Sequence, residues 1–562
     1  MRKFFAPSSP VGDGDGVPDV PPNKTSRHPS NECMQFRRDI KFRNPPSRGT
    51  TQDYSDITVI SRATPFQKWA SVQILCLVLL LVIRIINQTA NQNKKQKESD
   101  KMPIISAYIV PHPPLIVPEV GKGQEKTVQK TVDSYHIIAK KISEIKPQTI
   151  IVISPHSVMY ADYIHVSPGK NAQGSLKRFG APEVYKTDYD VQLADEICRL
   201  CDSMDFPAGS MGEKDASLDH GTLVPLYFIN KYYTDYQLIR CSISGLSRQE
   251  HYRFGMILSE AVENLNRKCV IVASGDLSHK LSDSGPYGFA PEGPELDKKL
   301  TDIMQSSDFG EFLRLDPNLC GKGAECGLGS FVIMSGALDK KSVAAQFYSY
   351  EGTTGVGYAV CGYNVKGDDP NRDFLTQNLS ESDKNIQNLR GAEDAFVRLA
   401  RETLESYVIS GKKPNLPDNL PDNLRERAGV FVSIKKNGQL RGCIGTIEPT
   451  QPTIAQEIMA NAVSSGTRDP RFSPVRKDEL PDLVYSVDVL FPAEPIKNED
   501  KNLLDVMRYG VIVTSGHKRG LLLPNLEGVD TVDEQLSIAC QKAGIGKNEK
   551  YQIERFEVIR HT

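Results

Sequence analysis

Short apolar runs alternate with longer amphipathic stretches between residues 102 and 366. Runs rich in Ile and Val predict strands, and these cover residues 104–110, 149–154, 236–243 and 269–273. Apolar positions three and four apart predict helices, and these cover residues 124–145, 188–201, 221–231 and 247–266. The alternation predicts an α/β domain with a mixed or parallel sheet flanked by helices.

The pattern changes after this region. Residues 367–388 are dominated by Asn, Asp, Ser and Gln, a composition typical of a linker. Residues 389–562 begin with an amphipathic helical pattern at 392–410 and continue with a strand-like run at 429–434. We therefore expect a second, smaller α+β domain in this part of the chain.

The N-terminal hundred residues differ from both domains. Residues 1–68 are polar and lack apolar periodicity, which predicts a disordered leader. The apolar segment 69–86 reaches the ~17–25 residues that cross a bilayer, so it predicts one transmembrane helix, followed by a linker at 87–101. Basic residues are more numerous after this segment, so the folded domains would be cytoplasmic and membrane-anchored. The alternative is that the working chain starts at Met102.

Composition narrows the classes of function. With 68 Lys and Arg against 70 Asp and Glu, the chain has no global positive field for nucleic acid, and we expect no nucleic-acid partner. Eleven cysteines in 562 residues are too sparse for a disulfide scaffold, which indicates a reducing compartment. Cys198 and Cys201 form a C-x-x-C inside a helical pattern with no second pair, and we interpret them as structural.

Histidines recur at the ends of the predicted strands. His112 follows the first strand, His156 follows the second, and His279 follows the run at 269–273; His220 stands at the start of a predicted helix. A single histidine at a strand end is more often a hydrogen-bonded loop residue than a ligand. Because ligand crevices open at the carboxyl edge of such sheets, their recurrence predicts one shared site.

Two neutral imidazoles and one carboxylate form the arrangement that holds Fe(II) with open positions. The Gly-rich segment 320–329 offers Glu325 as the carboxylate, and small residues would allow the backbone to approach a metal. The neighbouring Cys326 is the alternative ligand, and a thiolate would favour Zn or Cu. A Gly-rich loop with a solvated Glu is also compatible with this segment.

The first domain resembles the class III extradiol dioxygenase catalytic subunit (LigB type) and the related Memo family. The resemblance rests on His-Pro-Pro, Ser-Pro-His, Leu-Asp-His-Gly, Ser-Gly-Asp-Leu-Ser-His and Gly-Ala-Glu-Cys-Gly, in this order. The dioxygenase branch implies His112, His156 and Glu325 as iron ligands, His279 as acid/base group and His220 as a substrate- or oxygen-contacting residue. The Memo branch implies that Asp276, His279 and a cysteine at or near Cys326 take part.

The second domain resembles the AMMECR-type domain. The resemblance rests on Leu-Arg-Gly-Cys-Ile-Gly-Thr, Ser-Gly-Thr-Arg-Asp-Pro-Arg-Phe, Arg-Gly-Leu-Leu-Leu-Pro and Glu-Gly-Val-Asp-Thr. Domains of this type accompany Memo-type domains and a radical-SAM protein in the AmmeMemoRadiSam system, which implies a radical-SAM partner for this chain.

A second candidate site lies in these motifs. Arg441 flanks Cys443 and could lower the pKa of its thiol, which would make it nucleophilic. The sequence favours the alternative, a buried structural cysteine, because no histidine is adjacent in sequence. Arg468, Asp469 and Arg471 are either an anion-binding patch or a salt-bridged loop.

We therefore expect a non-haem Fe(II) dioxygenase-like enzyme that takes a small aromatic diol and dioxygen, with Zn or Cu as alternative metals. A Memo-like metal-binding or redox module that acts with a radical-SAM protein is the alternative function. A homo-oligomer is compatible with either.

Overall fold

The computed structural model describes residues 103–562 except residues 215–216, 437, 498–499 and 527. The chain divides between Asp373 and Phe374 into two compact units. The predicted leader, the segment 69–86 and the linker 87–101 lie outside the described residues.

The predicted fold class needs one correction, which concerns the membrane-spanning helix. Within the described residues, no helix combines the length and the apolar character needed to cross a membrane. The most apolar helices, α5 (His220–Asn230) and α10 (Leu328–Ala337), have 11 and 10 residues. They are shorter than the ~17–25 residues of a span and are buried core helices. The fold is thus a mixed α/β domain followed by a smaller α+β domain, with no spanning helix assigned.

The first unit is built on a six-stranded mixed sheet with the order β7-β2-β8-β1-β10-β9. Its first four strands are parallel and the last two antiparallel. The strands are β1 (Ile104–Val110), β2 (Thr149–Ser154), β7 (Gln237–Ser242), β8 (Cys269–Ser274), β9 (Lys341–Glu351) and β10 (Tyr358–Asp368). All four strands predicted from the sequence are confirmed. Parallel strands buried on both faces produce the continuous apolar runs seen in the sequence.

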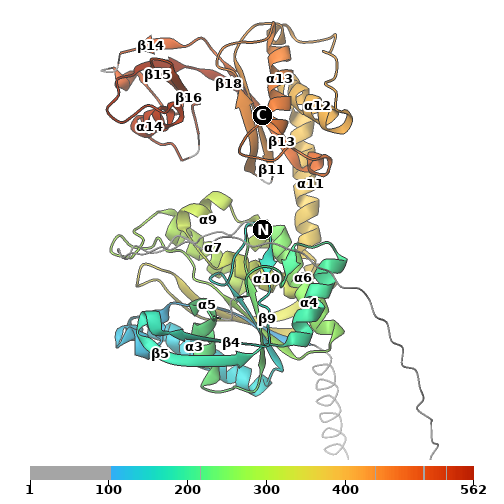
Figure 1. The fold of residues 1–562 in the computed structure, drawn as a ribbon, viewed down its shortest axis with the longest axis vertical. Coiled ribbons are helices and arrows are strands. Elements are labelled where there is room, and N and C mark those ends of the chain that lie inside the picture. Colours follow the sequence, from blue (N-terminus) through green and yellow to red (C-terminus); the bar gives the residue numbers. More distant parts are fainter. Residues whose placement is uncertain (1–102, 215–216, 437, 498–499, 527) are drawn as a thin grey trace, which may run out of the picture. The chain divides into compact units, whose positions relative to one another are not determined.

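Helices cover both faces of this sheet (Figure 1). α3 (Gln129–Ile145) and α5 pack on the face that presents Tyr108, Val152 and Val270. α10 packs against α6 (Arg248–Asn264), which also contacts α4 (Val191–Ser203). The remaining helices and strands are α2 (Pro118–Gly121), α7 (Glu292–Ser306), α8 (Gly310–Arg314), α9 (Pro317–Gly323), β3 (Ile164–His165), β4 (Asn171–Leu176), β5 (Ala181–Asp188) and β6 (Ala208–Gly209).

The second unit contains two four-stranded sheets, with the orders β12-β11-β13-β18 and β14-β17-β15-β16. Its strands are β11 (Val430–Lys436), β12 (Gln439–Gly445), β13 (Leu483–Leu490), β14 (Glu494–Ile496), β15 (Gly510–Ser515), β16 (Lys518–Leu522), β17 (Gln552–Phe556) and β18 (Val558–His561). Its helices are α11 (Phe374–Ala392), α12 (Ala395–Ser410), α13 (Ile454–Thr467) and α14 (Val532–Ala543). This confirms the expected α+β architecture.

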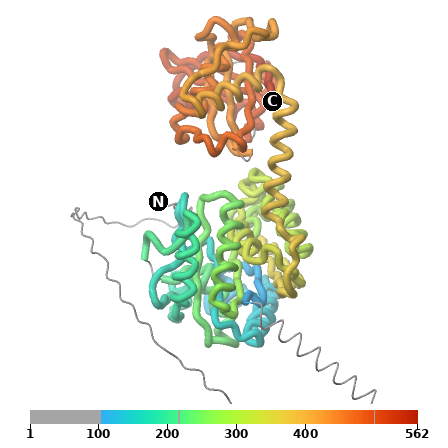
Figure 2. Tube along the Cα trace, turned by 90° about the vertical axis from the view of Figure 1, so that its right-hand side faces the viewer, coloured from blue at the N-terminus to red at the C-terminus, as the bar shows by residue number. Residues whose placement is uncertain are grey.

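α11 occupies most of the polar stretch with linker composition and is one straight helix in Figure 2. The stretch from Phe374 to Ala392 contains no proline, and Leu375 and Leu379 lie one helical turn apart. Polar composition alone therefore does not prevent a helix here.

Candidate metal centre

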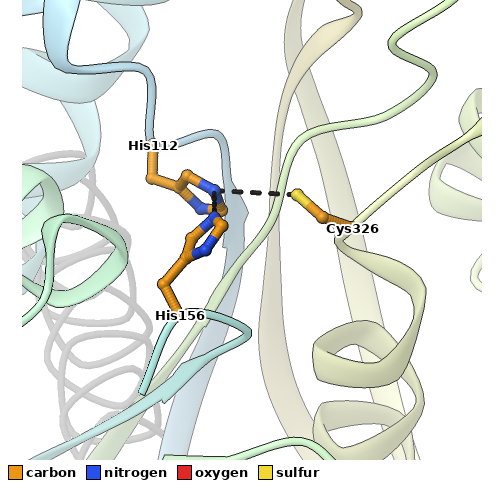
Figure 3. A group of neighbouring side chains, drawn as sticks. All are labelled: His112, His156 and Cys326. Atoms are coloured by element: carbon orange, nitrogen blue, oxygen red, sulfur yellow. Dashed lines mark hydrogen bonds between the residues drawn. The ribbon is translucent and has the colours of Figure 1, made fainter. Parts of the chain in front are cut away.

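Two histidines meet at the carboxyl edge of the central sheet. His112 follows β1 and His156 follows β2, and both strands pair with β8 in parallel. Their ring nitrogens Nε2 lie 2.9 Å apart, and His112 is 2% exposed. The rings point toward one another and toward Cys326 (Figure 3). The predicted convergence of the two imidazoles is therefore seen in the structure.

Cys326 supplies the third donor atom of this group. Its Sγ lies 3.6 Å from His112 Nε2, and the ligand atoms of His112, His156 and Cys326 all lie within 4.8 Å of one another. The loop before α10 brings Cys326 here because the backbone amides of Cys326 and Gly327 both donate to the Asp276 carbonyl, at 3.4 and 3.1 Å.

These spacings fit the donors of one transition-metal ion. Two nitrogens at about 2.0–2.1 Å from an ion are about 2.9 Å apart at a right angle and about 3.4 Å apart at a tetrahedral angle. The two imidazoles are spaced at 2.9 Å. A nitrogen and a thiolate sulfur at about 2.3 Å are about 3.6 Å apart at a tetrahedral angle, which equals the 3.6 Å between His112 and Cys326.

A serine fixes the tautomer of His112. Ser274 Oγ donates to the Gly221 carbonyl at 2.6 Å, so it accepts from His112 Nδ1 at 2.9 Å. The proton of the neutral ring is thereby held on Nδ1, and the Nε2 lone pair faces the other donors. Burial and the neighbouring imidazoles also lower the pKa of His112 well below its usual value, so the ring is neutral.

Asp276 and His279 form a second group with Cys326, again with ligand atoms within 4.8 Å of one another. Asp276 Oδ1 accepts from the His112 amide at 2.8 Å, and Oδ2 lies 4.0 Å from His112 Nε2. Burial raises the pKa of Asp276 to about 7. His279 Nδ1 donates to the Ala324 carbonyl at 2.6 Å, which leaves Nε2 as an acceptor. Two titratable side chains, Asp276 and His279, thus lie beside the candidate metal-ligand group.

Glu325 is not brought together with the two histidines. Its carboxylate accepts from the Leu328 amide at 2.6 Å, at the N-terminus of α10, where free backbone amides attract a carboxylate. Burial raises the pKa of Glu325. The residue predicted as the third metal ligand therefore caps a helix, and the alternative, Cys326, occupies the position beside the imidazoles.

His220 completes the histidine cluster. Its ring lies 4.1 Å from that of His156 and 5.4 Å from that of His112, measured between centroids. Burial lowers the pKa of both His220 and His156. Arg178 donates to His220 Nδ1 at 3.0 Å. The structure therefore brings together all four histidines singled out in the sequence.

Two residues at this centre were not singled out by sequence reasoning, Ser274 and Arg178. Ser274 is the first residue of the Ser-Gly-Asp-Leu-Ser-His motif and the last residue of β8. Its place at a strand end, like that of the histidines, could have indicated it. Arg178 lies in the turn between β4 and β5, and no motif marks it.

Arg441 and Cys443 of the second domain lie in β12, whereas Arg468, Asp469 and Arg471 follow α13, and two separate ion pairs hold Arg441 and Arg471. Arg441 donates twice to Glu479, at 2.9 and 3.0 Å. Asp469 accepts from Arg471 at 2.7 and 2.9 Å and from the Cys443 amide at 2.9 Å. Arg471 lowers the pKa of Asp469, with help from backbone amides.

The remaining candidates are Cys443, in β12, and Arg468, at the C-terminal end of α13. The Cys443 thiol accepts from Ser433 Oγ at 3.2 Å, and burial raises its pKa. The Arg468 side chain is exposed. Among the residues that the structure describes, no group of three potential metal ligands occurs in the second domain.

Comparisons with known families match both domains. Residues 106–361 match the family described as the catalytic LigB subunit of aromatic ring-opening dioxygenase. Residues 397–561 match the family AMMECR1. The predicted order of the two domains is confirmed.

Similar proteins extend over different parts of the chain. A Thermotoga maritima protein is 49% identical over 172 residues, which are 30% of this chain and 98% of that protein. The crystal structure of uncharacterized protein PH0010 from Pyrococcus horikoshii is 35% identical, covers 29% of this chain and 88% of that chain, and has a TM-score of 0.28.

A longer match includes both domains. Protein CA_C1420 from Clostridium acetobutylicum is 43% identical over 465 residues, which are 81% of this chain and 98% of that protein. The chain therefore belongs to the same family as this clostridial protein, and it joins a LigB-family domain to an AMMECR1 domain.

Proposed function

We propose that the first domain is a metal-dependent oxidoreductase module that binds one transition-metal ion through His112, His156 and Cys326. The observation that supports it is the convergence of these three ligand atoms within 4.8 Å. The Ser274 hydrogen bond presents the His112 lone pair to the same point. Two imidazoles and a thiolate suit copper and zinc, and iron is the remaining candidate.

The bound metal would supply Lewis acidity and, for copper or iron, one-electron chemistry. Cys326 would bind a metal as the thiolate, so it would have to lose its proton. Burial raises the pKa of the thiol well above its usual value, so the thiol keeps its proton until a metal binds. His279 Nδ1 donates to the Ala324 carbonyl, so the neutral ring has no proton on Nε2, and Nε2 would accept one from a ligand. Asp276, with a pKa of about 7, holds or releases a proton beside it.

Elemental analysis of the full chain, purified without added metal, tests this proposal. We expect about one equivalent of copper, zinc or iron in the wild type, because the three donors suit a single ion. His156→Ala is expected to lose it, whereas His136→Ala, a histidine of α3 outside the cluster, retains it. Retention of a full equivalent by a folded His156→Ala chain would contradict the assignment.

Extradiol opening of an aromatic ring, beside its two hydroxyls, is the second candidate activity. The LigB family match and the acid/base pair Asp276–His279 favour it. His279 would take a proton from a small aromatic diol, and dioxygen would be the co-substrate. Oxygen uptake with a panel of catechols and aminophenols tests this activity. His279→Ala should keep the metal and lose turnover.

For the second domain we propose an accessory role, supported by the ion pairs that hold Arg441 and Arg471. A radical-SAM protein is the proposed partner of both domains. Co-purification of the full chain with an iron–sulfur protein would support this partnership, and a chain that copurifies with none under anaerobic conditions would contradict it.

A further inference from the structure

The hairpin of β4 and β5 places an arginine beside the histidine cluster. Its turn, a 3₁₀ turn at Lys177–Phe179, carries Arg178. Arg178 Nη2 donates to His220 Nδ1 at 3.0 Å, and the His220 ring lies 4.1 Å from that of the metal-ligand candidate His156. The guanidinium therefore borders the proposed centre.

Phe179 fixes the position of this guanidinium. The Arg178 guanidinium carbon lies 4.5 Å from the centre of the Phe179 ring, and that ring lies 5.6 Å from His220. Stacking on the aromatic face keeps the group oriented without using its N–H donors. Of its five donors, one binds His220, so others remain for a ligand.

Arg178 forms no ion pair with a carboxylate of the described residues, and its side chain is exposed. Asp219, the carboxylate nearest to His220 in sequence, is held by other groups: Ser154 Oγ at 2.5 Å, the Thr222 amide at 3.0 Å and Arg240 at 3.6 Å. The imidazoles that Arg178 borders are neutral, and Asp219 already pairs with Arg240, so the Arg178 guanidinium is a positive charge available to a ligand at this edge of the centre.

We propose that Arg178 is a specificity residue that binds an oxyanion, a carboxylate or phosphate, of the ligand whose other end reaches the His112–His156–Cys326 centre. The inference rests on the proposed function, because it needs a ligand seated at that centre. A guanidinium matches the planar, bidentate geometry of such a group and binds it by charge-assisted hydrogen bonds. The site therefore selects acidic ligands over neutral ligands of the same shape.

The test uses the full chain loaded with Co(II), whose absorption bands report ligands that join its coordination sphere. Two probe pairs are titrated: imidazole-4-acetate with imidazole-4-acetamide, and 3-(imidazol-4-yl)propanoate with its amide. Members of a pair differ in charge at the far end and hardly in shape. We expect the wild type to bind at least one acid about tenfold more tightly than its amide, the usual gain from one charge-assisted contact.

Arg178→Gln keeps a side-chain N–H for His220 and removes the charge, so it should abolish the preference for the acid and leave amide binding unchanged. Lys177→Gln removes an equal charge from the neighbouring position and should keep the preference. If cobalt binds and the wild type prefers neither acid, or if Arg178→Gln retains the preference, the inference is overturned. If the wild type binds no cobalt, the proposed metal centre itself is wrong.

Discussion

Each of the two domains contains a cysteine among charged or titratable side chains. The two clusters differ in whether their polar atoms face one another or are already paired with other groups. In the first domain, Cys326 Sγ and the Nε2 atoms of His112 and His156 face one another. In the second, the Asp469 carboxylate already accepts hydrogen bonds from Arg471 and from the Cys443 amide. Residue types that suit chemistry therefore do not define a site. Donor atoms that face one another do.

The aspartates of the two clusters show the same contrast. Among the described residues, Asp276 pairs with no lysine or arginine and lies 4.0 Å from the neutral His112 ring, and burial raises its pKa to about 7. Asp469 is also buried, but Arg471 lowers its pKa. A carboxyl group with a pKa near neutrality can exchange protons, whereas one held ionised by an arginine serves as a fixed structural anion.

The sharpest way to break this comparison is a matched pair of cysteine substitutions. Cys326→Ser should lower the affinity of the full chain for zinc by at least about 100-fold, since loss of outer-shell partners alone costs roughly 10–100-fold. Cys443→Ser should leave zinc affinity unchanged, because its thiol contacts Ser433 and belongs to no group of potential metal ligands among the described residues. Competition with a chromophoric chelator measures both.

Equal losses of zinc affinity in the two cysteine variants would mean that the comparison between the clusters is wrong. Circular dichroism of both variants provides the folding control. Serine is only slightly smaller than cysteine and both positions are partly buried, so we expect both variants to fold.

A smaller effect is expected from the serines that support each cluster. Ser274→Ala removes the acceptor for His112 Nδ1–H, which frees the ring to change tautomer, and should lower zinc affinity about tenfold. Ser433→Ala removes the hydroxyl that donates to Cys443 and should not change it. If Ser274→Ala keeps wild-type affinity, the His112 tautomer is fixed by something other than this bond.

Most of the first domain's sheet could be predicted because its parallel strands are buried on both faces. β1 and β2 have the predicted bounds, 104–110 and 149–154. β9 and β10 were not predicted. β9 lies at the edge of the sheet and is largely half-buried or exposed, so its sequence lacks a continuous apolar run.

The histidines of the site could be predicted from their places at strand ends, whereas the third ligand could not. Glu325 and Cys326 are neighbours, and the turn of the chain decides which one faces the imidazoles. Ala324 adopts a left-handed conformation with φ of 53°, and Glu325 then caps α10. The order of potential metal ligands along the sequence predicts neither the turn at Ala324 nor the cap formed by Glu325.

The smallest effect concerns acid stability of the second domain. Because Arg471 lowers the pKa of Asp469 in the folded state, Asp469 stabilises the domain above its unfolded pKa, near 4, and this contribution is lost as the pH falls further. Asp469→Asn should reduce local stability by about 1 kcal/mol at pH 7, a typical net hydrogen-bond contribution, and flatten its decline below pH 4.

Hydrogen exchange of peptides covering residues 441–471 measures this local stability in the full chain. Arg476→Gln, which removes a cation paired with the exposed Asp478, is the matched control and should leave exchange at residues 441–471 unchanged. If hydrogen exchange in Asp469→Asn follows that of the wild type at every pH, the segment beside Cys443 is not held by the Asp469–Arg471 ion pair. Cys443 and its neighbours would then again be candidates for a reactive site, and the contrast between the two clusters would reduce to the presence of histidines.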